Sequence, residues 1–171
     1  MDDFKLSQHF TFFELTVTEN AALQEQNRAQ AILWVPSLKA VCDTLLEPVR
    51  NDKPLILNSG FRSWELNGAT PGSSPTSQHP RGQAADFHRK GQDMDLLFAE
   101  ILGILILKKI QFGQFIDEQA NRGYKVSRWL HLSLGANFWK PERCGEVLKM
   151  VAGPNGKPQY TTLQKIPQEG T

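Results

Sequence analysis

The sequence predicts an α+β fold, a single domain with a central antiparallel sheet flanked by helices. One observation is an apolar stripe between Leu38 and Val49, whose steps of three and four residues are those of an amphipathic helix. A second is the series of short apolar runs between turn residues later in the chain, which is typical of strands joined in hairpins. A length of 171 residues suits one domain and is short for two, so residues 1–171 are expected to form one unit.

Helices are expected first along the chain. Residues 19–33 are rich in Ala, Gln, Glu and Arg, which favour helix. Pro36 suits the first position of the next helix, where its missing N–H has no intrahelical partner. Cys42 falls on the apolar face of that helix, so a reduced thiol in the core is expected. With Cys144 as the only other cysteine, no disulfide framework is predicted.

A short strand and a loop follow these helices. Residues 53–58 form an apolar run that predicts a strand, and the turn at 59–63 would place Arg62 at its end. Residues 66–76 are rich in Gly, Ser and Pro, and we expect a loop there.

The next strand is expected at residues 84–88, where side chains alternate between the two sides of the chain. Asp86 and His88 would share one side of it. Asp93 or Asp95 can then cap a helix that runs to about residue 107.

A hairpin is expected after that helix. Residues 110–118 and 126–134 are apolar runs on either side of a polar turn at 119–123. An antiparallel pairing of the two runs would place Glu118 and His131 on neighbouring strands.

A smaller hairpin is expected near the C-terminus. Residues 147–151 and 159–163 flank the turn sequence at 153–158, which contains two glycines and two prolines. Residues 164–171 are expected to form a frayed tail.

Composition excludes several classes of function. A formal net charge of +1 and the absence of a basic run predict no nucleic-acid partner. The longest apolar run, residues 96–107, contains Glu100 and is shorter than the ~20 residues of a membrane span, so no stable membrane insertion is expected. The N-terminus carries acids where a secretory signal carries bases, which predicts synthesis in the cytoplasm without a signal peptide.

His79, Asp86 and His131 are the candidate ligands of one zinc ion, with water in the fourth position. A histidine and an aspartate seven residues apart are common by chance, and a lone polar histidine is usually a surface residue. Asp86, however, sits in a small, apolar strand, and leucines flank His131. Because unpaired polar groups are unfavourable in such surroundings, a shared metal would satisfy all three. Gly82 and the neighbouring alanines would let the chain pass close to the metal.

Two motifs carry a resemblance to a known family. Ser77-x-His79-x-x-Gly82-x-Ala84-x-Asp86 precedes Trp129-x-His131-x-Ser133. Together they resemble the zinc peptidases of peptidoglycan, which include D-alanyl-D-alanine carboxypeptidases, L-Ala-D-Glu endopeptidases and bacteriophage endolysins, and share their fold with the hedgehog signalling domain. Further segments fit the phage-type branch: Leu6-Ser7-x-x-Phe10-Thr11, Glu47-Pro48-Val49-Arg50, Ser59-Gly60-Phe61-Arg62-Ser63 with Leu66-Asn67, and Gln114-Phe115-Ile116-x-Glu118. The resemblance covers about residues 6–135 and leaves a C-terminal hairpin and tail at 136–171.

The resemblance implies roles for these residues. His79, Asp86 and His131 would hold zinc, which lowers the pKa of a bound water and polarises the scissile carbonyl. Glu118 would be the base that moves the water's proton to the leaving amine; its alternative is a solvated acid at a strand end. Arg62 would bind a substrate carboxylate or the developing oxyanion, or else form a structural ion pair.

Ser77 and Gln78 would support the ligands and contact substrate. Two positions depart from other branches of the family. Some relatives have a glutamate three residues before the last zinc histidine, where this chain has Arg128. Others have a second histidine two residues before it, where this chain has Trp129. The assignment of Glu118 therefore depends on the phage-type pattern. The remaining histidines, His9 and His88, are read as surface residues; the alternative for His88 is a place in the pocket, because it shares a strand face with Asp86.

We therefore expect a monomeric zinc metallopeptidase with its cleft on one face of the sheet. Its partner would be the stem peptide or cross-link of bacterial peptidoglycan. A phage or prophage lysin would act on the cell wall after release or delivery by the virion. Two alternatives stay open: a non-catalytic, zinc-stabilised binding module of the same fold, and a zinc peptidase that acts on a phage protein. Which bond is cut is also open, and the loop at 67–76 is expected to decide it.

Overall fold

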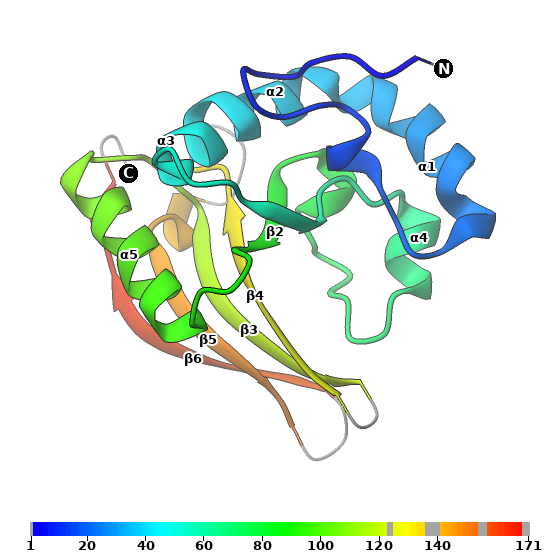
Figure 1. The fold of residues 1–171 in the computed structure, drawn as a ribbon. Coiled ribbons are helices and arrows are strands. Elements are labelled where there is room, and N and C mark those ends of the chain that lie inside the picture. Colours follow the sequence, from blue (N-terminus) through cyan, green and yellow to red (C-terminus); the bar gives the residue numbers. More distant parts are fainter. Residues whose placement is uncertain (1, 123–124, 136–140, 154–156, 169–171) are drawn as a thin grey trace.

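A computed structural model describes residues 2–122, 125–135, 141–153 and 157–168. In this part of the chain, six strands form one sheet in the order β1-β2-β4-β3-β5-β6 (Figure 1). The strands are β1 (Ile56–Ser59), β2 (Ala84–His88), β3 (Gln114–Arg122), β4 (Lys125–Ser133), β5 (Glu146–Ala152) and β6 (Pro158–Lys165). The helices are α1 (Gln24–Ala31), α2 (Val35–Val41), α3 (Glu47–Arg50), α4 (Trp64–Ala69) and α5 (Met94–Leu107). The prediction of a single α+β domain is confirmed.

The sheet has one apolar face and one polar face. Phe87, Leu130 and Phe115 belong to the face that packs against α2 and α5 in the main core. Phe98 of α5 stacks on Phe115 with ring centroids 4.8 Å apart. The helices therefore cover this face, as Figure 1 shows for α5, and leave the opposite face of the central strands for the cleft.

The expected long helix over residues 36–49 is present but changes its geometry partway. Residues 42–46 form a π-helical turn between α2 and α3. Pro48 cannot donate to the carbonyl of Thr44, and its ring crowds that carbonyl, so regular α-helical bonding is interrupted here. Cys42 is a free, buried cysteine, as expected.

The sheet departs from the fully antiparallel prediction at one ladder. The C-terminal hairpin forms as predicted, but β5 pairs with β3 in parallel, with Gln114 opposite Glu146. The hairpin therefore continues the main sheet. A pattern of apolar residues indicates a strand but carries no information on its partner.

Several expected boundaries are wrong. Residues 64–69 form α4, which includes residues 66–69 of the predicted loop, because the Ser63 side chain accepts the Leu66 N–H at 3.1 Å and caps the helix. The first strand of the central hairpin begins at Gln114 and continues to Arg122, so residues 119–122 are strand and not turn.

The predicted frayed tail is ordered over its described part. Residues 164 and 165 belong to β6, and the Gln168 side chain accepts the buried Phe112 N–H at 2.7 Å. The last residues of the tail, 169–171, and the predicted turn residues Gly123 and 154–156 lie outside the described part of the chain. Within the described residues, no helix combines the length and apolar character needed to cross a membrane.

A glycine at the start of β3 offers a test of the fold. A Cβ on Gly113 would lie 2.4 Å from the Leu134 carbonyl oxygen, whereas one on Gly103 in α5 meets nothing within 4 Å. We expect Gly113→Ala to lower the free energy of unfolding by about 1–3 kcal/mol through overpacking. Gly103→Ala should raise it by about 0.5–1 kcal/mol, because alanine loses less entropy in a helix. Urea denaturation measures both, and equal effects would contradict the close approach of β3 and β4.

Candidate metal centre and cleft

Three neighbouring strands place the metal-ligand candidates on the face of the sheet away from the core. Asp86 on β2 is the partner of His131 on β4, and His131 is the partner of Ile116 on β3. Glu118 lies one row further along β3, opposite Trp129. Because alternate residues of a strand share a face, Glu118 is a diagonal neighbour of His131 on this surface.

His79 reaches the same point from a separate short turn. It begins a 3-10 turn (His79–Arg81), and Gly82 with φ +62° ends this turn before β2. A Cβ on Gly82 would lie 3.1 Å from Trp34 and 3.2 Å from Leu38, so the glycine permits close packing on α2. The expectation that Gly82 makes room beside the metal is therefore wrong.

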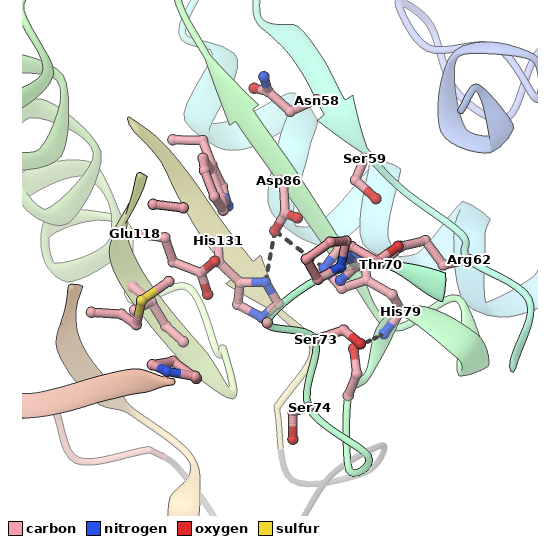
Figure 2. Close-up of a pocket in the computed structure, with 18 of the residues that line it drawn as sticks. Asn58, Ser59, Arg62, Thr70, Ser73, Ser74, His79, Asp86, Glu118 and His131 are labelled. Carbon is pink, nitrogen blue, oxygen red and sulfur yellow. Dashed lines mark hydrogen bonds and ion pairs between the residues drawn. The ribbon is translucent and has the colours of Figure 1, made fainter. Parts of the chain in front are cut away.

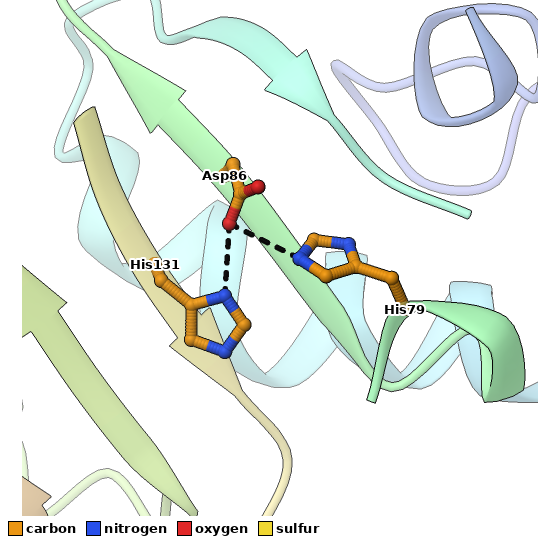
Figure 3. Close-up of side chains that lie close together, drawn as sticks. All are labelled: His79, Asp86 and His131. Carbon is orange, nitrogen blue, oxygen red and sulfur yellow. Dashed lines mark hydrogen bonds and ion pairs between the residues drawn. The ribbon is translucent and has the colours of Figure 1, made fainter. Parts of the chain in front are cut away.

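The three side chains form one buried cluster, shown in Figure 3. His79 Nε2 lies 3.1 Å and His131 Nδ1 lies 2.8 Å from the same oxygen of Asp86. The exposed fractions are 1% for His79, 5% for Asp86 and 7% for His131. One ligand atom from each residue lies within 4.8 Å of the others, so the cluster could hold a metal ion.

The tautomer of His79 shows that this cluster fits a cation. His79 Nδ1 lies against the Gly60 carbonyl oxygen, which can only accept, so a neutral ring carries its proton there. Nε2 then presents a lone pair to the Asp86 carboxylate. Two buried acceptors that face each other require a cation or a proton between them. The nitrogen, nitrogen and oxygen donor set is one that zinc accepts.

The surroundings of His79 and Asp86 keep both side chains in the protonation state that can bind a metal. Burial lowers the pKa of His79 to about 4, and the charge of Arg62 acts in the same direction. Burial alone would raise the pKa of Asp86, but the hydrogen bond that its carboxylate accepts from His131 Nδ1 acts in the opposite direction, and the pKa lies below its usual range. Near neutral pH the cluster therefore contains a neutral His79 and an ionised Asp86.

Glu118 is half-buried beside this cluster. Burial raises its pKa to about 7, and the charge of Asp86 adds to the effect, while His131, Arg62 and Trp129 act against it. A carboxyl group with this pKa can take up and release a proton near neutral pH.

Arg128 faces away from the cleft. Its guanidinium lies 2.7 Å from each carboxylate oxygen of Asp117 and also contacts Asp95 of α5, on the core side of the sheet. A glutamate at this position of the regular strand would likewise point away from His131. This geometry favours Glu118 over position 128 as the acid beside the metal ligands.

Arg62 lines the cleft on the other side of the cluster, as Figure 2 shows. Its buried Nε has no hydrogen-bond partner among the described residues, and no described carboxylate forms an ion pair with it. The structural ion pair considered for Arg62 is thus absent from the described part of the chain. Its guanidinium is available for an anionic group of a ligand.

Asn27 holds the turn that carries Arg62. Its amide donates to the Phe61 carbonyl at 3.2 Å and to the Thr16 carbonyl at 2.9 Å, and its oxygen accepts the Ser63 N–H at 2.7 Å. The two bonds to the turn lie on either side of Arg62. Sequence reasoning missed Asn27, although a buried asparagine in a helix of Ala, Gln and Glu residues was a possible signal.

Comparison with known families agrees with this site. A family model described as peptidase M15 matches residues 8–116, more than half of the chain. The chain belongs to the peptidase M15 family. Members of this family are zinc peptidases, and this supports a metallopeptidase with its metal at the cluster described above. The matched stretch contains Arg62, His79 and Asp86 and ends before Glu118 and His131. No curated protein matches the sequence.

The supporting residues of this M15 chain lie where the motif suggested. The Ser77 hydroxyl accepts the His79 N–H at 3.3 Å, and both Ser77 and Gln78 line the cleft. The Gln78 side chain is 3% exposed, and its Nε2 has no hydrogen-bond partner within the described residues. Two other histidines lie outside the cleft lining: His88 contacts Asn58 at 2.8 Å, and His9 contacts Glu47 at 2.7 Å.

The cleft is much larger than the metal cluster. Its volume is about 1130 Å³, and it extends from the polar segment at 70–77 to β5 and β6. Met150 and Tyr160 also line it, which sequence reasoning missed because it treated the C-terminal hairpin as separate from the core of the domain. Residues 69–74 of the predicted loop do border the cleft.

Zinc binding by the cluster is testable with Asp86→Asn. We expect the protein to bind one zinc ion, and zinc at about 1000 times its Kd to stabilise it by about 4 kcal/mol. The variant should bind zinc at least about 100-fold more weakly, because it loses the charged ligand. Equilibrium dialysis and the zinc-induced shift in Tm measure this. His88→Ala, on the same strand, is the matched control, and equal loss in both variants would contradict the assigned cluster.

The raised pKa of Glu118 predicts a pH-dependent stability of the metal-free protein. The folded state retains this proton up to about pH 7, whereas the unfolded state releases it near 4.5. The folded state therefore loses stability as pH rises between these values and regains none above them. Glu118→Gln should raise Tm more at pH 8 than at pH 5. Thermal unfolding in the presence of a chelator measures this, and a pH-independent difference would contradict the raised pKa.

Proposed function

We propose that this M15 peptidase uses zinc to hydrolyse amide bonds in the stem peptide or cross-link of bacterial peptidoglycan. The observation that carries the proposal is the position of Glu118, which shares a sheet face with Asp86 and His131 and lies one row away. A zinc-stabilised binding module would not need a half-buried carboxyl group with a pKa of about 7 at this point.

The metal ligands and Glu118 have different roles in the proposed reaction. His79, Asp86 and His131 would hold the zinc, which when bound activates water and polarises the scissile carbonyl. Glu118 accepts the proton of the attacking water and returns it to the nitrogen of the leaving amine. Its pKa suits both transfers near neutral pH.

Arg62 binds the anionic part of the substrate. Figure 2 shows Arg62 and Glu118 on opposite sides of the metal cluster. Arg62 Nε has no partner among the residues that the structure describes, and its guanidinium can bind a carboxylate or the developing negative oxygen through parallel hydrogen bonds. Asn27 keeps the turn rigid, so the guanidinium is positioned before substrate arrives.

Peptidoglycan fits this site better than an ordinary protein chain. Stem peptides carry free carboxylates, which complement Arg62. The motifs around His79 and His131 resemble peptidoglycan peptidases of the phage-type branch, which supports a lysin that acts on the cell wall.

Hydrolysis of purified peptidoglycan tests the proposal. We expect the zinc-loaded protein to release fragments with new stem-peptide ends, identified by mass spectrometry. Glu118→Gln should lower the rate by about 100-fold or more, because the proton acceptor is lost while zinc remains bound. Glu142→Gln, an exposed acid outside the cleft lining, is the control.

Each other outcome points to a different function. Full activity of Glu118→Gln would contradict its role as base. Zinc binding without any hydrolysis of peptidoglycan or protein would support a binding module. Hydrolysis of proteins without new stem-peptide ends would support a peptidase that acts on a phage protein.

A further inference from the structure

The cleft continues beyond the metal cluster along the outer strands of the sheet. Trp129, Glu118, Met150 and Tyr160 are successive partners across β4, β3, β5 and β6. All four line the cleft, so they form one row on its floor. Trp129, Met150 and Tyr160 lie outside residues 8–116, the stretch that the family model matches.

On the side of β5, the neighbour of Glu118 in this row is the apolar side chain of Met150. Met150 is 7% exposed and packs with Ile116 and Leu148 in a small cluster separate from the main core. A thioether is polarisable and adapts to aliphatic chains of different shapes. Next to Glu118, the floor therefore offers an apolar surface and not a second charged site.

Tyr160 forms the outer edge of the row. It is 50% exposed, so its ring has surface that a ligand can cover. It is the register partner of Met150, which is in turn the partner of Glu118, so Tyr160 lies two strands from the catalytic acid in the same row. An aromatic ring with a neutral hydroxyl suits contact with a peptide side chain.

Small residues form the next row. Ala120 is opposite Ser127, and Ala152 is opposite Pro158, and these residues also line the cleft. Their short side chains leave space above the sheet. An extended chain can therefore pass over them beside Met150 and Tyr160.

The cleft also extends in the opposite direction, past Arg62 to residues 70–76. The metal cluster thus lies between an anion-binding side and an apolar side. A volume of about 1130 Å³ exceeds the needs of a single small residue, since pockets of about 300–1,000 Å³ hold drug-sized ligands. A peptide bound here has contacts on both sides of the scissile bond.

We propose that Trp129, Met150 and Tyr160 form a substrate subsite for a long aliphatic side chain. The side chain belongs to the residue on the carbonyl side of the scissile bond, while Arg62 holds a carboxylate on the amine side. This subsite rests on the proposed function, because its ligand is the peptide that the metal centre cleaves.

Peptide binding to the zinc-loaded Glu118→Gln protein, which does not turn substrate over, tests the subsite. The probes are two stem-peptide analogues that differ only in norleucine or alanine on the carbonyl side. Calorimetry should show about tenfold tighter binding of the norleucine peptide. Adding Tyr160→Ala should remove this preference, and Tyr160→Phe should retain it.

Leu163→Ala is the matched control. Leu163 lies on the same strand with an exposed fraction of 51%, close to that of Tyr160, but does not line the cleft. The control should keep the preference. Equal affinity of the parent for both peptides, binding of neither, or the same loss in Tyr160→Ala and Leu163→Ala would overturn the subsite.

Failure of the subsite and failure of the proposed function give different results. If the unmutated protein releases stem-peptide ends but the Glu118→Gln protein shows no preference for norleucine, the proposed function holds and the subsite does not. A protein that shows the preference but cleaves neither the analogues nor peptidoglycan has the subsite without the function.

Discussion

The contact between His79 Nδ1 and the Gly60 carbonyl is the constraint on which the site depends. It assigns the proton of His79 to Nδ1 and turns the lone pair of Nε2 toward Asp86. It also joins the metal ligand to the turn that carries Arg62, since the Arg62 N–H contacts the His79 carbonyl from the same turn at 3.4 Å. The candidate metal ligand His79 and the turn that carries Arg62 are therefore parts of one hydrogen-bonded unit.

Because side chains alternate between the two faces of the sheet, the residues that stabilise the fold lie on one face and the candidate site residues lie on the other. The face with Phe87 and Leu130 is buried under the helices and supplies most of the apolar burial of the domain. The other face carries Asp86, Glu118 and His131, and His79 reaches it from a separate turn; these polar groups would be unfavourable in such a core. Arg128 and His131 illustrate the separation: they are three residues apart on a regular strand, yet one binds Asp117 on the core side and the other lies beside Asp86 in the cleft.

Much of the site could be predicted from the sequence because its residues lie in short motifs. The spacing of His79 and Asp86 and the leucines around His131 indicated buried ligands, and the hairpin pattern placed Glu118 on the adjacent strand. Contacts between residues far apart in the sequence were not predictable. The contribution of Tyr160 depends on the parallel pairing of β5 with β3, and that of Asn27 on packing between α1 and the turn at 60–63, neither of which leaves a local pattern. The helix α4 was missed because its cap, Ser63, belongs to the motif around Arg62 and was read only in that context.

The parallel ladder between β3 and β5 also has a consequence for the order of folding. The β3–β4 and β5–β6 hairpins pair residues that are near in sequence, so each can close early. The union of the two hairpins joins Gln114 to Glu146, which are 32 residues apart in the sequence. The pairing of β2 with β4 joins Asp86 to His131, which are 45 residues apart, and therefore closes a longer loop. We infer that the second hairpin, with the part of the cleft lined by Met150 and Tyr160, can dock on β3 before the candidate metal ligands of β2 and β4 meet.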